Sequence, residues 1–209
     1  MERPPVLSLD AWARDWRDLG VEADKALWEQ ILARYDEPHR KYHTTQHLAE
    51  CLALWQETHT LARRPGEVAV ALWFHDAIYD PHRHDNEAQS AEWARSVVAQ
   101  SATSDAAERV SDLIMATRHD ATPVDADAQL LVDIDLAILG AAPERFDEYE
   151  GQVREEYGWV PGFLFRSTRR RILDGFLARP RIYATDHLHE RREESARANL
   201  RRSIERLGG

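Results

Sequence analysis

Apolar residues recur along the 209-residue chain at the i, i+3, i+4 and i+7 spacing of helix faces. Ser8, Asp24 and Thr44 or Thr45 stand where helix caps are expected, and Gly20 and Pro38 stand where helices should stop. A proline suited to a first helical turn, Pro65, starts the helix expected to run into His75 and Asp76. Later helices are predicted over residues 86–100, 104–117, 127–139, 143–157 and 161–177, with a last one beginning near His189.

No alternating strand pattern, internal repeat or low-complexity linker is evident in the sequence. The pattern therefore predicts an all-α fold, a globular bundle of about nine or ten helices. The length favours a single domain over residues 1–209.

Composition adds limits to this picture. The 43% of hydrophobic residues and seven tryptophans allow a sizeable core. No apolar run approaches the roughly 20 residues of a membrane span, and the N-terminus lacks a signal-peptide core. Cys51 is the only cysteine, so no disulfide can form within the chain. We expect a cytoplasmic protein with no membrane partner.

The net charge of −10 disfavours binding to polymeric nucleic acid or anionic membranes. The charge is uneven, because 12 arginines face 6 acidic residues from Pro161 onward. This basic tail is interpreted as a solvated helical surface. The alternatives are a wall that attracts phosphate and a contact between copies in a homo-oligomer.

The strongest chemical signal is His75-Asp76 within the apolar run 69–80. A buried carboxylate needs a partner or a metal, and histidine is the commonest metal ligand in proteins. His47 lies upstream, and Asp133 and Asp135 lie downstream in a second apolar run. Together these residues predict a site for a divalent cation. The alternative is that the histidines are hydrogen-bonded core residues and Asp76 is a buried cap.

Helix geometry limits the site further. Residues 133 and 135 differ by about 200° around a helix, so only one of them is expected to reach the ion. The surrounding residues are apolar on both sides, so periodicity does not choose between them.

The order His47, His75-Asp76, Asp135 resembles the signature of the HD superfamily of metal-dependent phosphohydrolases. Its bacterial "predicted metal-dependent HD superfamily phosphohydrolase" branch is the more similar one. The segments that carry the resemblance are 35–47, 73–81, 85–87, 133–140 and 196–200. The resemblance implies a bundle of the HD-domain type with His47, His75, Asp76 and Asp135 as metal ligands. It favours Asp135 over Asp133 as the last ligand.

Two imidazoles and two carboxylates suit Mn, Fe, Co, Ni, Zn or Mg, without the thiolates of a closed zinc site. The resemblance then implies a hydrolase that cleaves a phosphoester of a nucleotide or another small phosphorylated metabolite through a metal-activated water. Asp76 would take part in catalysis as well as in metal binding. Cys51 falls on a helix face that we expect to be buried, which is atypical of a nucleophile.

Other polar residues near these segments are candidates for the reaction. Glu87 could orient the attacking water, although Asn86 with Gln89 also resembles a helix capping box. Arg40 and Lys41 could contact a substrate phosphate, and the alternative is solvated loop charge. His43 and His119 are candidate substrate contacts, with a turn and a helix end as their alternatives.

Two other functions stay open. The metal site could serve a ligand-binding or sensing module without significant turnover. Some relatives of the HD fold are di-iron oxygenases, so the resemblance leaves an oxygenase open. A di-iron centre would need more ligands than the four assigned, and only His43 and His119 are further candidates. No phosphate-binding glycine loop, dinucleotide fingerprint or serine-nucleophile elbow is found in the sequence.

Overall fold

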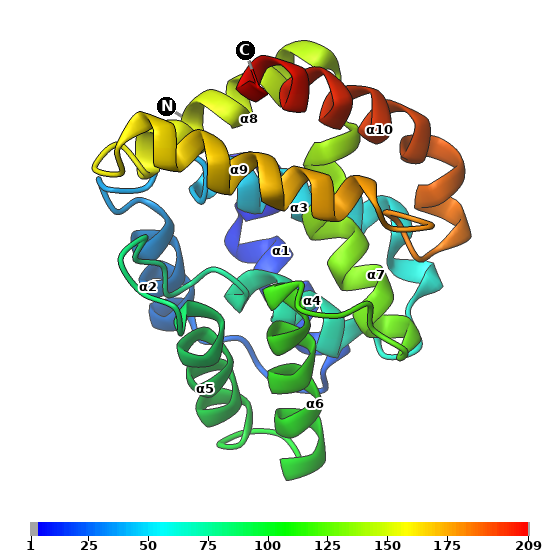
Figure 1. Cartoon of the computed structure of the whole chain (residues 1–209). Helices are drawn as coiled ribbons and strands as arrows, with labels where there is room; N and C mark the ends of the chain where they lie inside the picture. The colour runs from blue at the N-terminus through cyan, green and yellow to red at the C-terminus, as the bar shows by residue number, and fades with distance from the viewer. Residues whose placement is uncertain (1–3, 209) are drawn as a thin grey trace. The chain divides into compact units, whose positions relative to one another are not determined.

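The computed structural model describes residues 4–208, and within that range it contains helices and no strand. This confirms the all-α prediction (Figure 1). The α-helices are α1 (Leu9–Asp18), α2 (Lys25–Tyr35), α3 (Thr45–Thr58), α4 (Pro65–Phe74), α5 (Asn86–Val98), α6 (Ser104–Met115), α7 (Ala126–Asp135), α8 (Pro143–Glu156), α9 (Gly162–Leu177) and α10 (Asp186–Gly208). Short 3-10 turns are η1 (Pro5–Leu7), η2 (His59–Leu61), η3 (Ala116–Arg118) and η4 (Leu136–Gly140).

The chain divides into two compact units, residues 1–134 and 135–209. Each unit has its own internal packing and is described by itself. This division does not test whether the chain folds as one domain, so the single-domain assignment stays a prediction.

The helix starts of the first unit follow from local capping. The Ser8 side chain accepts a hydrogen bond from the Ala11 amide, and Asp24 and Thr44 do the same at the starts of α2 and α3. Gly20 follows α1 with a φ of +82°, a conformation that only glycine adopts without strain. These helix starts were predicted from the sequence, because a cap needs only residues within one turn.

Helix α4 is the centre of the first unit. It packs against α1, α3, α5 and α6, and all of its residues from Gly66 to Phe74 are buried (Figure 1). Beyond Glu67 this helix is apolar around its whole circumference, which is why the sequence shows a continuous apolar run there. Gly66 allows the close approach of α1, since a β-carbon would lie 2.6 Å from the Asp18 carbonyl oxygen.

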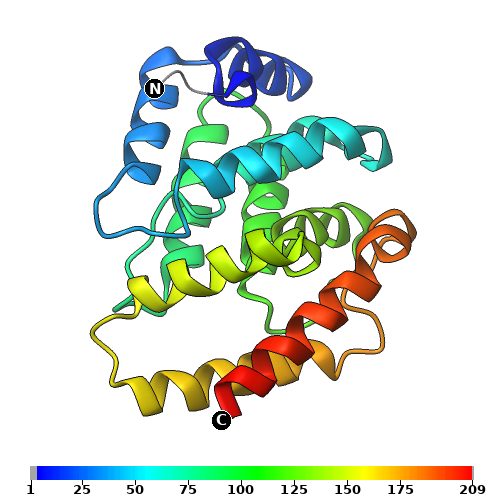
Figure 2. The same ribbon diagram turned by 90° about the horizontal axis from the view of Figure 1, so that it is seen from above.

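The second unit is built on α10. This helix packs along α9 and against the η4 turn, as the gold and red segments of Figure 2 show. The Asn199 amide donates to the Leu139 and Ala141 carbonyls, and the Tyr183 hydroxyl donates to the Leu136 carbonyl. Long-range side-chain bonds therefore hold the η4 backbone in place.

Three predicted helix boundaries were wrong. The helix predicted over 127–139 ends at Asp135 and continues as the η4 turn, whose Leu136 and Leu139 carbonyls accept the side-chain bonds just described. The last helix begins at Asp186, before His189. α4 ends before His75.

None of the helices in the described part of the chain combines the length and the apolar character that a membrane span requires.

Candidate metal centre

The backbone stops being helical where the two principal ligands lie. α4 ends at Phe74, with His75 as its C-cap and Asp76 in the turn that follows. In a continued helix the Leu72 carbonyl would accept the Asp76 amide. That carbonyl instead lies 2.8 Å from His75 Nδ1, and the Asp76 amide donates to the Tyr35 hydroxyl over 3.2 Å. Because both residues lie in this turn, the directions of their side chains are not set by the 100° spacing of a helix.

The same contact orients the His75 ring. Since a carbonyl can only accept, Nδ1 carries a proton toward Leu72, and Nε2 is the nitrogen turned toward the cluster. Metal-binding histidines are commonly oriented by such a bond on the far nitrogen. His75 therefore presents Nε2 as a ligand atom.

Three ligand atoms meet at this turn. His47, on the first turn of α3, places its Nε2 3.1 Å from His75 Nε2. Asp76 Oδ2 lies 3.4 Å from His47 Nε2 and 3.2 Å from His75 Nε2. Both histidines are 1% exposed, whereas the Asp76 side chain is 15% exposed. Solvent thus reaches this triangle on the Asp76 side.

The distances between the three ligand atoms suit a shared metal ion. Nitrogen and oxygen ligands at about 2.0–2.2 Å from a metal lie about 2.9–3.5 Å from one another in octahedral or tetrahedral geometry. All three distances in the triangle fall in that range. The residues present therefore suit a divalent cation.

The electrostatics keep the carboxylate ionised. Burial raises the pKa of the Asp76 carboxyl. The imidazoles of His75, His43 and His47 outweigh burial, so this pKa lies well below its ordinary value. Burial also raises the pKa of the Tyr35 hydroxyl to about 12, which keeps it protonated beside the turn.

A thiol joins the cluster, which the sequence analysis did not anticipate. Cys51 follows His47 by one helical turn on α3, and its Sγ lies 3.7 Å from His47 Nδ1 and 3.8 Å from Nε2. One ligand atom each from His47, Cys51 and His75 lie within 4.8 Å of one another. The predicted ligand set contained no sulfur, so Cys51 is an additional candidate ligand. The i, i+4 spacing was the signal available in the sequence.

Arg40 holds the loop before α3 against the turn after α4. Its buried guanidinium donates to the carbonyls of His43, Asp76 and Ala77 and to the Glu37 carboxylate. Its side chain is 0% exposed. These bonds give Arg40 a positioning role, whereas the neighbouring Lys41 is exposed and donates to the Pro38 carbonyl.

The remaining predicted residues of the first unit border Asp76. The half-buried His43 ring stacks on Tyr79 with ring centroids 4.1 Å apart. Burial raises the pKa of the Glu87 carboxyl, and the Asp76 charge adds to this while Arg118 and His119 oppose it. His119 ends η3 with a φ of +57°, in the left-handed region. The structure thus brings His43, Glu87 and His119 within electrostatic reach of the triangle, directly or through one another.

The predicted capping box at α5 was wrong. Asp85 is the N-cap residue, and the Asn86 side chain instead pairs with the backbone of Asp80 over 3.1 and 3.0 Å. Ser90 similarly binds the backbone of Ile78. These bonds fix the loop after the His-Asp turn and so set the position of Glu87.

The two downstream aspartates fall in different units. Asp133 is buried in the first unit, whereas Asp135 is the last residue of α7 and the first residue of the second unit, where it is half-buried. Within the second unit, Asp135 contributes to the raised pKa of Tyr149, whose main cause is burial. The choice between the two as a ligand stays a prediction.

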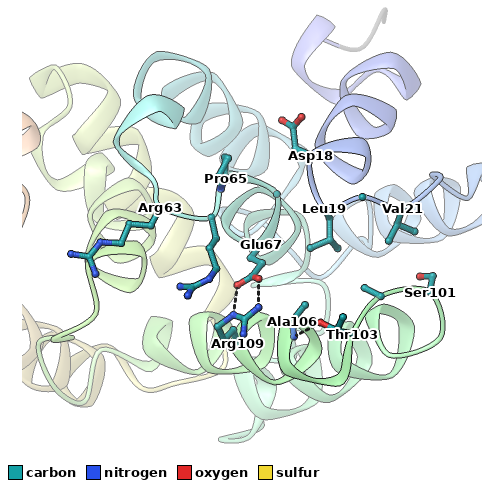
Figure 3. Close-up of a pocket in the computed structure, with 14 residues that line it drawn as sticks. Asp18, Leu19, Val21, Arg63, Pro65, Glu67, Ser101, Thr103, Ala106 and Arg109 are labelled. Carbon is teal, nitrogen blue, oxygen red and sulfur yellow. Dashed lines mark hydrogen bonds and ion pairs between the residues drawn. The ribbon is translucent and has the colours of Figure 1, made fainter.

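A separate pocket of about 630 Å³ lies at the other end of α4. It is bordered by the α1–α2 turn, the start of α4 and the α5–α6 turn (Figure 3). Its buried acid, Glu67, is held by Arg109 through bonds of 2.8 and 2.6 Å. This pocket contains none of the candidate ligands.

Comparison with models of protein families, with curated proteins and with solved structures found no match to this chain. The site is therefore characterised by its own geometry. That geometry is an all-helical scaffold with a buried group of histidine, cysteine and aspartate side chains that could hold a metal ion.

Proposed function

We propose that this protein is a metal-dependent phosphohydrolase of the HD superfamily type. The observation that carries the proposal is the mutual approach of His47 Nε2, His75 Nε2 and Asp76 Oδ2 to within 3.4 Å of one another. The ordered resemblance of the sequence segments to that family supports the same conclusion. Bound there, a divalent ion would supply Lewis-acid chemistry toward water and a phosphoryl oxygen.

Asp135 is the proposed fourth ligand. It follows Ile134 in the same helix, about 200° around the axis from Asp133. The resemblance aligns it with the last ligand of the family, five residues before Gly140. Two imidazoles and two carboxylates would leave an octahedral ion room for water and a substrate oxygen.

The chain's own residues have distinct tasks in this proposal. Asp76 holds the ion, and Glu87 accepts a proton from the attacking water. His43, His119 and Lys41 contact the substrate phosphate. Arg40 acts from behind the site, because its guanidinium is committed to backbone carbonyls.

The substrate class is a nucleotide or another small phosphorylated metabolite. The net charge of −10 disfavours a long polynucleotide. The ligand atoms are also nearly enclosed, with solvent contact limited to the Asp76 side. A small phosphoester is therefore the proposed substrate.

The test is a panel of phosphate-release assays on the full chain. Nucleotides and small phosphoesters would each be offered with Mn, Fe, Co, Ni, Zn and Mg. We expect release with at least one pair, and none from chelator-treated protein or from Asp76→Asn. Metal binding without release across the panel would contradict the hydrolase.

That second outcome would favour a ligand-binding or sensing module. The enclosure of both histidines, each 1% exposed, is the observation that favours this alternative. Such a module would hold the ion stoichiometrically and change ligand affinity with metal occupancy.

A further inference from the structure

Cys51 and His47 lie on one face of α3. They are four residues apart, the spacing that brings two side chains of a helix beside each other. The same i, i+4 spacing lets paired histidines bind one zinc ion in helical metalloprotease sites. Cys51 is therefore placed where a second ligand from α3 would be.

The sulfur lies slightly beyond the separation expected of a ligand that shares an ion with His47. A nitrogen at about 2.05 Å and a sulfur at about 2.3 Å from one ion lie about 3.1–3.6 Å apart in octahedral or tetrahedral geometry. Cys51 Sγ lies beside the His47 ring, 3.7 Å from Nδ1 and 3.8 Å from Nε2, so it would have to turn toward the ion when the ion binds. It also belongs to the group of ligand atoms that lie within 4.8 Å of one another.

Burial alone would not distinguish this cysteine, because free cysteines commonly pack as small apolar side chains. Cys51 is 2% exposed, as such a residue would be. What distinguishes it is its contact with the His47 ring, whose Nε2 lies 3.1 Å from His75 Nε2 and 3.4 Å from Asp76 Oδ2.

We propose that Cys51 binds the metal ion as a thiolate, an inference that rests on the proposed metal-dependent function. The thiol proton is released to solvent when the ion binds, and the sulfur lone pair forms the bond. A soft thiolate selects zinc, cobalt or iron over magnesium and manganese, which prefer oxygen ligands. The centre then takes a borderline transition metal.

The test is cobalt(II) titration of the metal-free full chain, followed by absorption spectroscopy. Cys51 is the only cysteine, so any sulfur-to-cobalt charge-transfer band must come from it. We expect that band in the wild type and its loss in Cys51→Ser. We expect the affinity for zinc to fall at least about tenfold in that variant. Loss of a residue that only hydrogen-bonds to a metal ligand already costs about that much. Binding of magnesium should be equally weak in both.

Leu52→Ala is the matched control, since Leu52 is also 2% exposed on α3 and no ligand. It should keep the band despite lost packing. Cobalt bound by the wild type without a charge-transfer band would overturn the role of Cys51 and leave the proposed function intact. Absence of cobalt and zinc binding in the wild type would overturn both. The wild-type spectrum decides the question even where a variant fails to fold.

Discussion

His75 and Asp76 lie in a turn whose geometry depends on contacts from Tyr35 and Arg40. Each offers one ligand atom to the triangle. We expect His75→Ala or Asp76→Ala to abolish stoichiometric metal binding. Metal analysis of purified variants checks this, with His59→Ala on the exposed η2 turn as control. Full occupancy in both variants would refute the centre.

Asp133 and Asp135 offer a second test at the residue scale. If Asp135 is the last ligand, Asp135→Asn should lose metal and activity. Asp133→Asn should chiefly lower stability, because it alters a buried side chain. Metal content and thermal melting would be measured on both. The opposite assignment of metal loss would identify Asp133 as the ligand, and equal loss would implicate both.

Glu87 lies within electrostatic reach of Asp76, and burial raises the pKa of its carboxyl. As a proton acceptor it should contribute to turnover and leave the ion in place. Glu87→Gln is expected to lower turnover by about 10²–10⁴-fold, the usual contribution of general-base catalysis, with metal occupancy unchanged. Assay and metal analysis must agree. Full turnover with only a lower melting temperature would reduce Glu87 to a helix-start residue.

At the scale of elements, Asp15 of α1 determines how α1 meets α4. Its buried carboxylate accepts a 2.8 Å hydrogen bond from the Trp73 indole. Burial raises the pKa of Asp15 despite that bond and the Arg14 charge. Because the folded-state pKa is raised, the stability it contributes is complete below the ordinary carboxyl pKa and is lost as pH rises through the folded value.

Asp15→Asn should therefore raise the free energy of unfolding at neutral pH, since the amide oxygen still accepts from Trp73 without a buried charge. The gain should shrink at acid pH, where the wild-type carboxyl is protonated. Urea unfolding at both pH values measures the difference. Asp10→Asn, an exposed position on α1 that does not affect the Asp15 pKa, is the control. A pH-independent difference, or a loss of stability, would contradict this account.

At the scale of the whole molecule, metal binding and folding should be linked. An ion that binds only the folded chain at about 1,000 times its dissociation constant stabilises it by about 4 kcal/mol. For a chain of this size that corresponds to a rise in Tm of about 10 °C. Calorimetry with and without chelator measures it, and Asp76→Ala should show no rise. An equal rise in the variant would mean that the ion binds elsewhere.

The helix starts could be predicted because they depend on neighbours in the chain. Ser8, Asp24 and Thr44 cap α1, α2 and α3 through amides two or three residues away. The all-α class follows equally from periodicity, and His47, His75 and Asp76 stood out as polar ligands in apolar runs. By itself the sequence determined these, because each is a local property of the chain.

Only the tertiary structure decided where α4 ends and what surrounds its end. Tyr35 and Arg40, more than 30 residues away in the chain, form hydrogen bonds with the backbone of the turn. Asn86 pairs with Asp80 and not with Gln89. Arg40 became a buried positioning residue, and Cys51 became a neighbour of the ligands. Hydrogen bonds between distant segments depend on how those segments pack. The pattern of apolar and polar residues along the chain therefore does not predict which partner a polar group will have.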